Sequence, residues 1–167
     1  ECGYCTHKSW GFGKITTVDT VFSRFLIDFE TKDGHSMDLG FGADTLKPIP
    51  TDHILVRKTK DLQGLHQMAA LNHIDLIKLV LESFEGTATA AQIQEVLVPD
   101  VISDDWRKWW DGVRKELKKD GHFRVPIKKS EPILYNAEAV SLEERLLGDF
   151  KAARGLKARI TVANEMV

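Results

Sequence analysis

A dense block of cations between residues 106 and 129 carries the most apparent chemistry in this sequence. The block holds nine lysines and arginines against three aspartates and glutamates, whereas residues 61–105 hold one against eight. Such local segregation is typical of a surface that contacts a polyanion or an acidic protein. The residues predicted to make this contact are Arg107, Lys108, Arg114, Lys115, Lys118, Lys119, Lys128 and Lys129.

One amphipathic helix would position most of these cations, because an apolar stripe recurs at helical spacing. The stripe consists of Trp106, Trp109, Trp110, Val113 and Leu117. Some cations fall on one flank of it and others opposite it, at about 100° per residue. We expect Trp106, Trp110 and Val113 to be core residues, and Trp109 to lie at the margin, where it could meet a partner. The expected N-cap is Ser103, and Gly121 is expected to end the helix.

Two interpretations of this basic face remain open. It could be an ordinary solvated surface with ion pairs along the helix. It could instead bind nucleic acid, mainly through phosphates, because few Asn or Gln residues accompany the arginines for base readout. The pI near 6.3 argues against a strongly DNA-binding protein of the repressor type.

Metal and redox chemistry are less well supported. Cys2, Cys5 and His7 resemble half a zinc site, and His35 could complete it only if the chain folded back. An ordinary N-terminal segment is the preferred interpretation, and no cofactor is predicted.

No catalytic set is apparent either. Gly11-Phe12-Gly13 lacks the Lys and the helix of a phosphate loop, and neither His53 nor His73 has a candidate nucleophile nearby. We therefore expect a protein that is not an enzyme and has no small-molecule substrate.

The first fifty residues predict β structure. Alternating apolar residues indicate a hairpin over 24–41 that turns at residues 32–34, and an extended segment follows around Ile54 and Val56. Short strands this close together suggest a small SH3-like or Tudor-like barrel.

From Asp61 the period becomes helical, with helices expected near 61–71, 74–84 and 89–97, where Thr89 and Gln92 form a capping box. The basic helix and a hairpin over 123–135 follow, and this order is that of a winged-helix domain. The fold class is therefore α+β. The predicted domains are 1–57 for the β domain, 58–140 for the winged helix, and 141–167 for a C-terminal helix leading to an absent downstream region.

Composition sets the class of protein. The chain is 43% hydrophobic and 29% charged, and it contains no apolar run long enough to span a membrane. Two cysteines and the lack of a secretory signal favour a cytoplasmic protein. Because the sequence starts at Glu1 without a Met, we expect it to be a piece of a longer protein.

Two segments resemble the amino-terminal extension of large Gre-type bacterial transcription elongation factors of chlamydia-like and verrucomicrobia-like bacteria. They are Ser9-Trp10-Gly11-Phe12-Gly13-Lys14-Ile15 and Asp105-Trp106-Arg107-Lys108-Trp109-Trp110. The resemblance covers about residues 2–140. It implies a role beside RNA polymerase during elongation. The acidic coiled-coil tip of that family has no counterpart here, so its cleavage-stimulating residues are not carried over.

The predicted function is therefore a non-catalytic accessory module that contacts RNA polymerase and the backbone of DNA or RNA. The β domain would contact protein through Phe12, expected to be exposed, and Asp33. The alternative is a module that binds proteins only.

Overall fold

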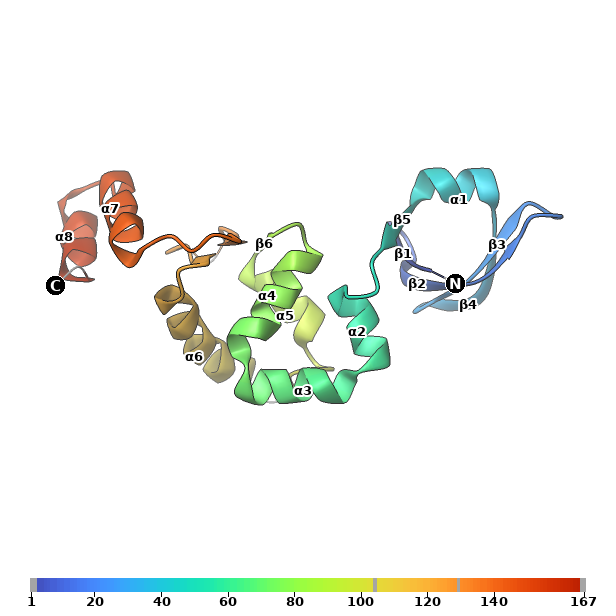
Figure 1. Cartoon of the computed structure of the whole chain (residues 1–167), viewed down its shortest axis with the longest axis horizontal. Coiled ribbons are helices and arrows are strands. Elements are labelled where there is room, and N and C mark those ends of the chain that lie inside the picture. Colours follow the sequence, from blue (N-terminus) through green and yellow to red (C-terminus); the bar gives the residue numbers. More distant parts are fainter. Residues whose placement is uncertain (1–2, 104, 129, 166–167) are drawn as a thin grey trace. The chain divides into compact units, whose positions relative to one another are not determined.

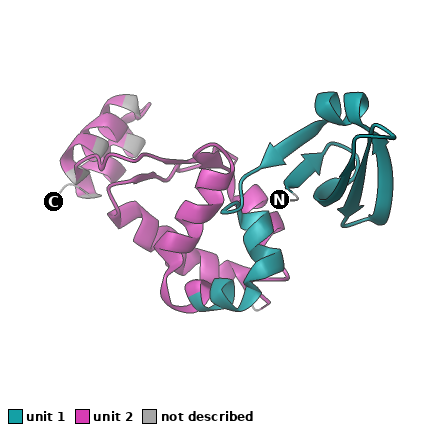
Figure 2. Cartoon of the chain, turned by 45° about the vertical axis from the view of Figure 1, so that its right-hand side comes forward, with its two compact units in different colours: residues 1–67 teal, residues 68–167 magenta. Residues whose placement is uncertain are grey.

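The computed structural model describes residues 3–103, 105–128 and 130–165, and the chain forms two compact units, residues 1–67 and 68–167 (Figure 2). Helices and antiparallel strands occur in both units, which confirms the α+β class. No described helix is long and apolar enough to cross a membrane.

The first unit contains one antiparallel sheet whose strands lie in the order β4-β3-β2-β1-β5 (Figure 1). The strands are β1 (Tyr4–His7), β2 (Gly11–Asp19), β3 (Arg24–Phe29), β4 (Lys32–Asp38) and β5 (Leu46–Ile49). Among the described strands, β4 and β5 are the two ends of this order and do not pair with each other. The closed SH3-like or Tudor-like barrel is therefore not confirmed.

The hairpin of β3 and β4 turns earlier than the sequence predicts. Phe29 pairs with Lys32, so the two residues between them make the turn. Asp33-Gly34 lies within β4 at a register shift, where the Gly34 amide donates a 2.8 Å hydrogen bond to the Asp28 carboxylate. Gly34 has φ +60°, which glycine adopts without strain. The Asp-Gly pair therefore forms a bulge, and the expected turn at 32–34 is wrong.

Two short helices replace segments that the alternation predicted to be extended. Helix α1 (Leu39–Thr45) starts inside the predicted hairpin, because the Asp38 carboxylate accepts hydrogen bonds from two amides of the first turn. Helix α2 (Ile54–Lys60) occupies the last expected strand, and the His53 Nδ1 accepts from a first-turn amide. In both cases the hydrogen bonds of an N-cap residue favour a helix, although the alternation of apolar residues predicts a strand.

The core of this unit is small and includes a cysteine. Cys5, Ile27, Phe29 and Met37 are buried together, with Trp10, Ile15, Phe25 and Leu46 packed around them. Gly13 is required next to this core, because a Cβ there would lie 2.6 Å from the Phe29 ring.

The second unit contains the winged helix, in the order α4, β6, α5, α6, β7, β8 (Figure 1). The bounds are α4 (His73–Ser83), β6 (Thr87–Ala88), α5 (Ala90–Leu97), α6 (Trp106–Lys119), β7 (Phe123–Arg124) and β8 (Ile133–Tyr135). Strand β8 pairs with β7 on one side and with β6 on the other. The predicted helices and hairpin are present, and β6 is an additional strand.

Helix α3 (Leu62–Leu71) precedes α4, and Asp61 accepts a hydrogen bond from the Gly64 amide, as an N-cap does. The capping box of Thr89 and Gln92 opens α5 as predicted. Helices α7 (Leu142–Ala152) and α8 (Leu156–Glu165) follow the wing, with Ser141 as the N-cap of α7.

Candidate nucleic-acid interface

Helix α6 begins at Trp106, and its N-cap is Asp105. The Asp105 carboxylate accepts hydrogen bonds from the Arg107 and Lys108 amides, at 3.0 and 3.4 Å. A carboxylate at this end also interacts favourably with the helix dipole. The predicted cap, Ser103, is therefore wrong by two residues, and Asp104 lies outside the described residues. The helix ends at Lys119 with an extended Asp120, so Gly121 is not its cap.

The inner face of α6 is the predicted apolar stripe, but its side chains are not equally buried. Val113 and Leu117 are fully buried, whereas the three tryptophans are half-buried. Trp106 and Trp110 stack on each other, with ring centroids 5.2 Å apart and planes 13° apart. The tryptophans therefore cover the first turns of the helix as one aromatic layer.

Trp109 is the best anchored of the three. Its indole Nε1 donates a 2.7 Å hydrogen bond to the Ala69 carbonyl, and its ring meets the His73 ring edge-on at 5.7 Å. Helix α3 ends at Leu71, so the Ala69 carbonyl has no donor within its own helix. The expected marginal position of Trp109 is wrong, because this side chain fastens α6 to the preceding helices.

Glu116, an acidic residue of the basic block, is also engaged in this packing. Its Oε2 lies 3.0 Å from the Nδ1 of His73 on α4. The Glu116 side chain is still 48% exposed, and among the described residues its ion-pair partner is His73 and not a lysine of α6.

Five of the predicted cations lie on the solvent side of α6 and are exposed: Arg107, Lys108, Lys115, Lys118 and Lys119. None of the five has a carboxylate within 4.0 Å in the described ranges 3–103, 105–128 and 130–165. We call this set the basic arc, since at about 100° per residue it lies on one side of the helix, which also carries the exposed Asp111. An exposed arc of unpaired cations presents a positive field to solvent.

Arg114, in contrast, is not a free cation. Its Nη2 donates hydrogen bonds to the Pro126 and Ile127 carbonyls, at 2.8 and 3.3 Å. These carbonyls belong to the loop that leaves β7, so the guanidinium holds the wing against α6. This contact gives Arg114 a role in positioning the wing, and its predicted contact with a ligand stays a prediction.

The wing itself carries mixed charge. Lys128 is 77% exposed, and its Nζ lies 3.6 Å from the Glu131 carboxylate. A pair this exposed contributes little to stability and can be exchanged for a phosphate. Lys129 lies outside the described residues. Arg124 on β7 is exposed beside these residues, and the sequence interpretation missed it, although it belongs to the same cationic block.

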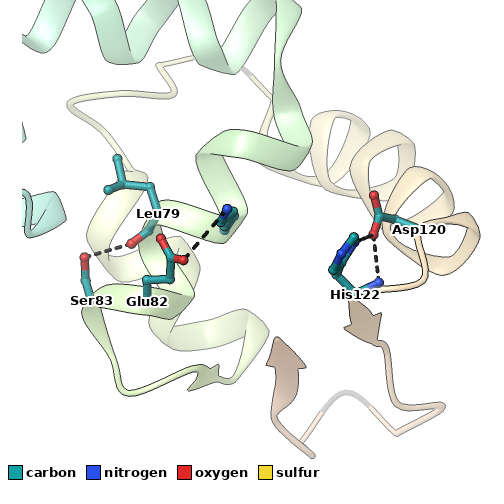
Figure 3. A network of polar contacts seen from close by, with 6 residues as sticks. Leu79, Glu82, Ser83, Asp120 and His122 are labelled. Atoms are coloured by element: carbon teal, nitrogen blue, oxygen red, sulfur yellow. Dashed lines mark hydrogen bonds and ion pairs between the residues drawn. The ribbon is translucent and has the colours of Figure 1, made fainter. Parts of the chain in front are cut away.

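The turn between α6 and β7 is fixed by Asp120 and His122 (Figure 3). The Asp120 Oδ1 accepts a 2.8 Å hydrogen bond from the His122 amide and lies 3.0 Å from the ring Nδ1. On α4, the Lys78 ammonium lies 5.4 Å from the centre of the Tyr135 ring, and the Tyr135 hydroxyl raises the lysine pKa. Helix α4 and β8 therefore hold the base of the wing together.

A hollow of about 690 Å³ lies beside the wing. Arg114, Lys118 and Arg124 line it from α6 and β7, and Glu144 and Asp149 line it from α7. Its lining thus contains both charges, so this side of α6 is less purely cationic than the side that carries Lys115 and Lys119.

The predicted protein contacts of the first unit have different outcomes. Phe12 is buried, with 7% of its surface exposed, and stacks on Tyr4 with centroids 5.7 Å apart. The expectation of an exposed Phe12 is wrong, because the Tyr4 ring of the neighbouring strand covers it. Asp33 is exposed in the bulge of β4.

The zinc interpretation has no geometric support among the described residues. The Cys5 thiol is buried and donates to the Gly13 carbonyl at 3.7 Å, and burial raises its pKa, which disfavours the thiolate that zinc requires. Cys2 lies outside the described residues. His7 and His35 each lie against Trp10, with ring centroids 4.3 and 4.2 Å away. No group of three or more His, Cys, Asp or Glu in the described ranges could hold a metal ion.

A winged helix with its third helix turned to solvent defines the helix-turn-helix class of module. Residues 55–140 match the family model of the GRAD helix-turn-helix domain, and the chain belongs to this family. The similarity to the amino-terminal part of Gre-type factors is also confirmed by relatives of known name.

Three of these relatives are similar along most of the chain. A protein of Treponema pallidum named "Putative GreA-associated domains protein" is 29% identical over 98% of the chain. Proteins named "Transcription elongation factor GreA" are 26% identical over 96% of the chain in Chlamydia trachomatis and 30% identical over 74% in Chlamydia pneumoniae. The chain covers 25%, 23% and 17% of these three proteins, so it corresponds to a minor part of each. No solved structure matches the chain.

Proposed function

We propose that this chain is a non-catalytic accessory module of a transcription elongation factor, and that its basic arc binds the phosphate backbone of nucleic acid beside RNA polymerase. The relatives named as elongation factors support the transcription setting. The single observation that carries the nucleic-acid contact is the set of exposed, unpaired cations on the solvent side of α6.

The geometry favours phosphate contact over base readout. Lys108, Lys115 and Lys119 lie opposite the buried stripe, where the third helix of a winged-helix domain meets its ligand. Lysine ammonium groups are point charges that suit phosphates and do not distinguish bases in a fixed geometry. Binding should therefore be independent of sequence and strongly dependent on salt.

Arg114 and Lys128 complete the proposed surface in different ways. Arg114 keeps the wing in place, and Lys128 at the wing can exchange its exposed Glu131 partner for a phosphate. We further propose a β domain over 1–57 with an SH3-like or Tudor-like arrangement, the winged helix over 58–140, and a cytoplasmic location. No small-molecule substrate or cofactor is part of this proposal.

The test is salt-dependent binding to a random DNA duplex and to a single strand, measured by fluorescence anisotropy. The variant Lys115→Glu/Lys118→Glu/Lys119→Glu should bind at least about tenfold more weakly at low salt. The slope of log K against log salt should fall by about 2 to 3, since each phosphate contact contributes roughly 0.9. An unchanged slope would remove the nucleic-acid contact from the proposal.

The matched control reverses the same amount of charge in the first unit, where Lys8, Lys14 and Lys47 are exposed. The variant Lys8→Glu/Lys14→Glu/Lys47→Glu has the same net charge as the test variant and should retain most of the binding. Equal loss in both variants would show that overall charge, and not the basic arc, governs the affinity.

The second candidate is a module that binds only proteins, with the basic arc against an acidic surface. The acidic composition of residues 61–105 favours it, because another copy could supply the complementary charge. Absence of duplex and single-strand binding at low salt, together with self-association that the same triple variant abolishes, would select this candidate.

A further inference from the structure

A hollow of about 420 Å³ in the first unit combines an aromatic ring with charged side chains. Tyr4, half-buried on β1, lines this hollow, and its ring stacks on the buried Phe12 ring with the planes 10° apart. The stacking fixes the orientation of the Tyr4 ring. The negative face of such a ring attracts cations, so the hollow contains a preformed aromatic seat for a positive group.

A cation of the chain itself lies at this seat. The Nζ of Lys60, the last residue of α2, is 5.2 Å from the centre of the Tyr4 ring. Lys60 is exposed, and the ion pairs formed among the described residues do not include it. An exposed contact between an ammonium group and a ring is weak, so a second ammonium group can replace the first. The position of Lys60 thus identifies the chemical group that the ring accepts.

The charges of the lining limit the ligand to one positive group. Two lysines, Lys14 and Lys60, and two carboxylates, Asp28 and Glu30, line the hollow. Lys14 stands between Tyr4 and Asp28 in the strand register. When Lys60 withdraws, one negative charge is left uncompensated, and one alkylammonium group restores the balance. A polyamine would bring several ammonium groups beside Lys14, where like charges repel.

We propose that this hollow binds the lysine side chain of a basic peptide, which displaces Lys60 from the Tyr4 ring. The incoming ammonium group would lie against the ring and near the carboxylates of Asp28 and Glu30. The volume of the hollow is within the range of ligand pockets, roughly 300–1,000 Å³. The site uses no residue of the basic arc, so the inference is independent of the proposed nucleic-acid contact.

The experiment titrates the peptide Gly-Gly-Lys-Gly-Gly, blocked at both ends, into the full chain and follows amide chemical shifts by NMR. The same peptide with glutamine in place of lysine should bind more weakly, because it lacks the ammonium group. The variant Lys60→Ala should bind the lysine peptide at least about threefold more tightly, since the competing ammonium group is gone. The matched control Lys8→Ala removes the same charge from an exposed residue outside the lining, and its affinity should stay unchanged.

Two further variants test the seat directly. Tyr4→Leu should weaken binding of the lysine peptide at least about threefold by removing the ring. Glu30→Gln should weaken it in the same direction, and this exposed residue can be changed without disturbing the packing of the sheet. The shifted amides should be those of residues that line the hollow.

The outcomes separate this inference from its rivals. Equal affinity for the lysine and glutamine peptides overturns it, as does a Lys60→Ala variant that binds no more tightly than Lys8→Ala. Spermidine that binds the hollow more tightly than the lysine peptide overturns the choice of a peptide. The triple variant of the basic arc should bind the lysine peptide like the original chain, so failure of the nucleic-acid proposal leaves this site standing.

Discussion

The indole of Trp109 on α6 donates its hydrogen bond to the Ala69 carbonyl on α3, at 2.7 Å. Forty residues separate the two in sequence, and the carbonyl belongs to the last turn of its helix, where no intrahelical donor remains. One side chain therefore both satisfies the end of α3 and sets the position of α6 in the second unit.

The substitution Trp109→Phe should lower the free energy of unfolding by about 1–3 kcal/mol, because it leaves the Ala69 carbonyl without its donor. Urea unfolding followed by circular dichroism measures the change. Trp110→Phe is the matched control, since Trp110 forms no such bond within the described residues, and it should cost less. Equal losses would mean that ring size, and not the hydrogen bond, accounts for the effect.

The substitution Arg114→Lys should loosen the wing while keeping the charge. A lysine cannot reproduce the planar guanidinium that reaches the Pro126 and Ile127 carbonyls. We expect faster amide exchange in peptides covering residues 125–132 and a stability loss of about 0.5–1.5 kcal/mol. Hydrogen exchange with mass spectrometry checks this. Lys118→Ala, one turn away, should leave wing exchange unchanged, and equal exchange in the two variants would contradict the positioning role.

Stability should depend on pH through His35. Burial, followed by the charges of Lys32 and His7, lowers the His35 pKa from its ordinary value of 6.5. The unfolded chain therefore binds more protons at this histidine, so its contribution to stability is complete above about pH 6.5. It is lost as the pH falls through the lowered folded-state pKa.

The measurement is the free energy of unfolding between pH 4.5 and 7.5, for the original chain and for His35→Gln. The original chain should lose stability toward low pH more steeply than the variant. Parallel curves would show that other groups cause the acid dependence.

Replacing Gly112 by alanine should stabilise α6 by about 0.5–1 kcal/mol, because glycine in a helix interior is conformationally costly. A Cβ at this position would meet nothing within 4 Å. Thermal unfolding measures the gain. Gly13→Ala is the opposite case, since its Cβ would lie 2.6 Å from the Phe29 ring, and it should destabilise the first unit. A loss of stability in Gly112→Ala would contradict the open position of this residue.

Much of the second unit could be predicted from the sequence, because long amphipathic helices repeat their signal over several turns. The stripe from Trp106 to Leu117 fixed the inner face of α6, and Thr89 with Gln92 marked the start of α5. Strand β6 has two residues, too few to show an alternation of apolar and polar residues. It is a strand because it pairs with β8.

The first unit was harder to predict, because short elements depend on single caps. Leu39 and Phe41 continue the alternation of the preceding strand, yet the Asp38 carboxylate bonds to the next amides and starts a helix. The burial of Phe12 depends on its contact with Tyr4 on the neighbouring strand, which alternation within one strand does not reveal. In the candidate site, sequence identified the cations but not their partners, and only the three-dimensional contacts distinguish Arg114 from Lys115.

Strand β8 is hydrogen-bonded along both of its edges, to β6 and to β7. Its residues consequently cannot shift without breaking two ladders. If the proposed contact with nucleic acid is made, β8 therefore acts as a fixed base, and we expect changes of length in the β7–β8 connection to alter binding more than substitutions within β8 that keep its pairing.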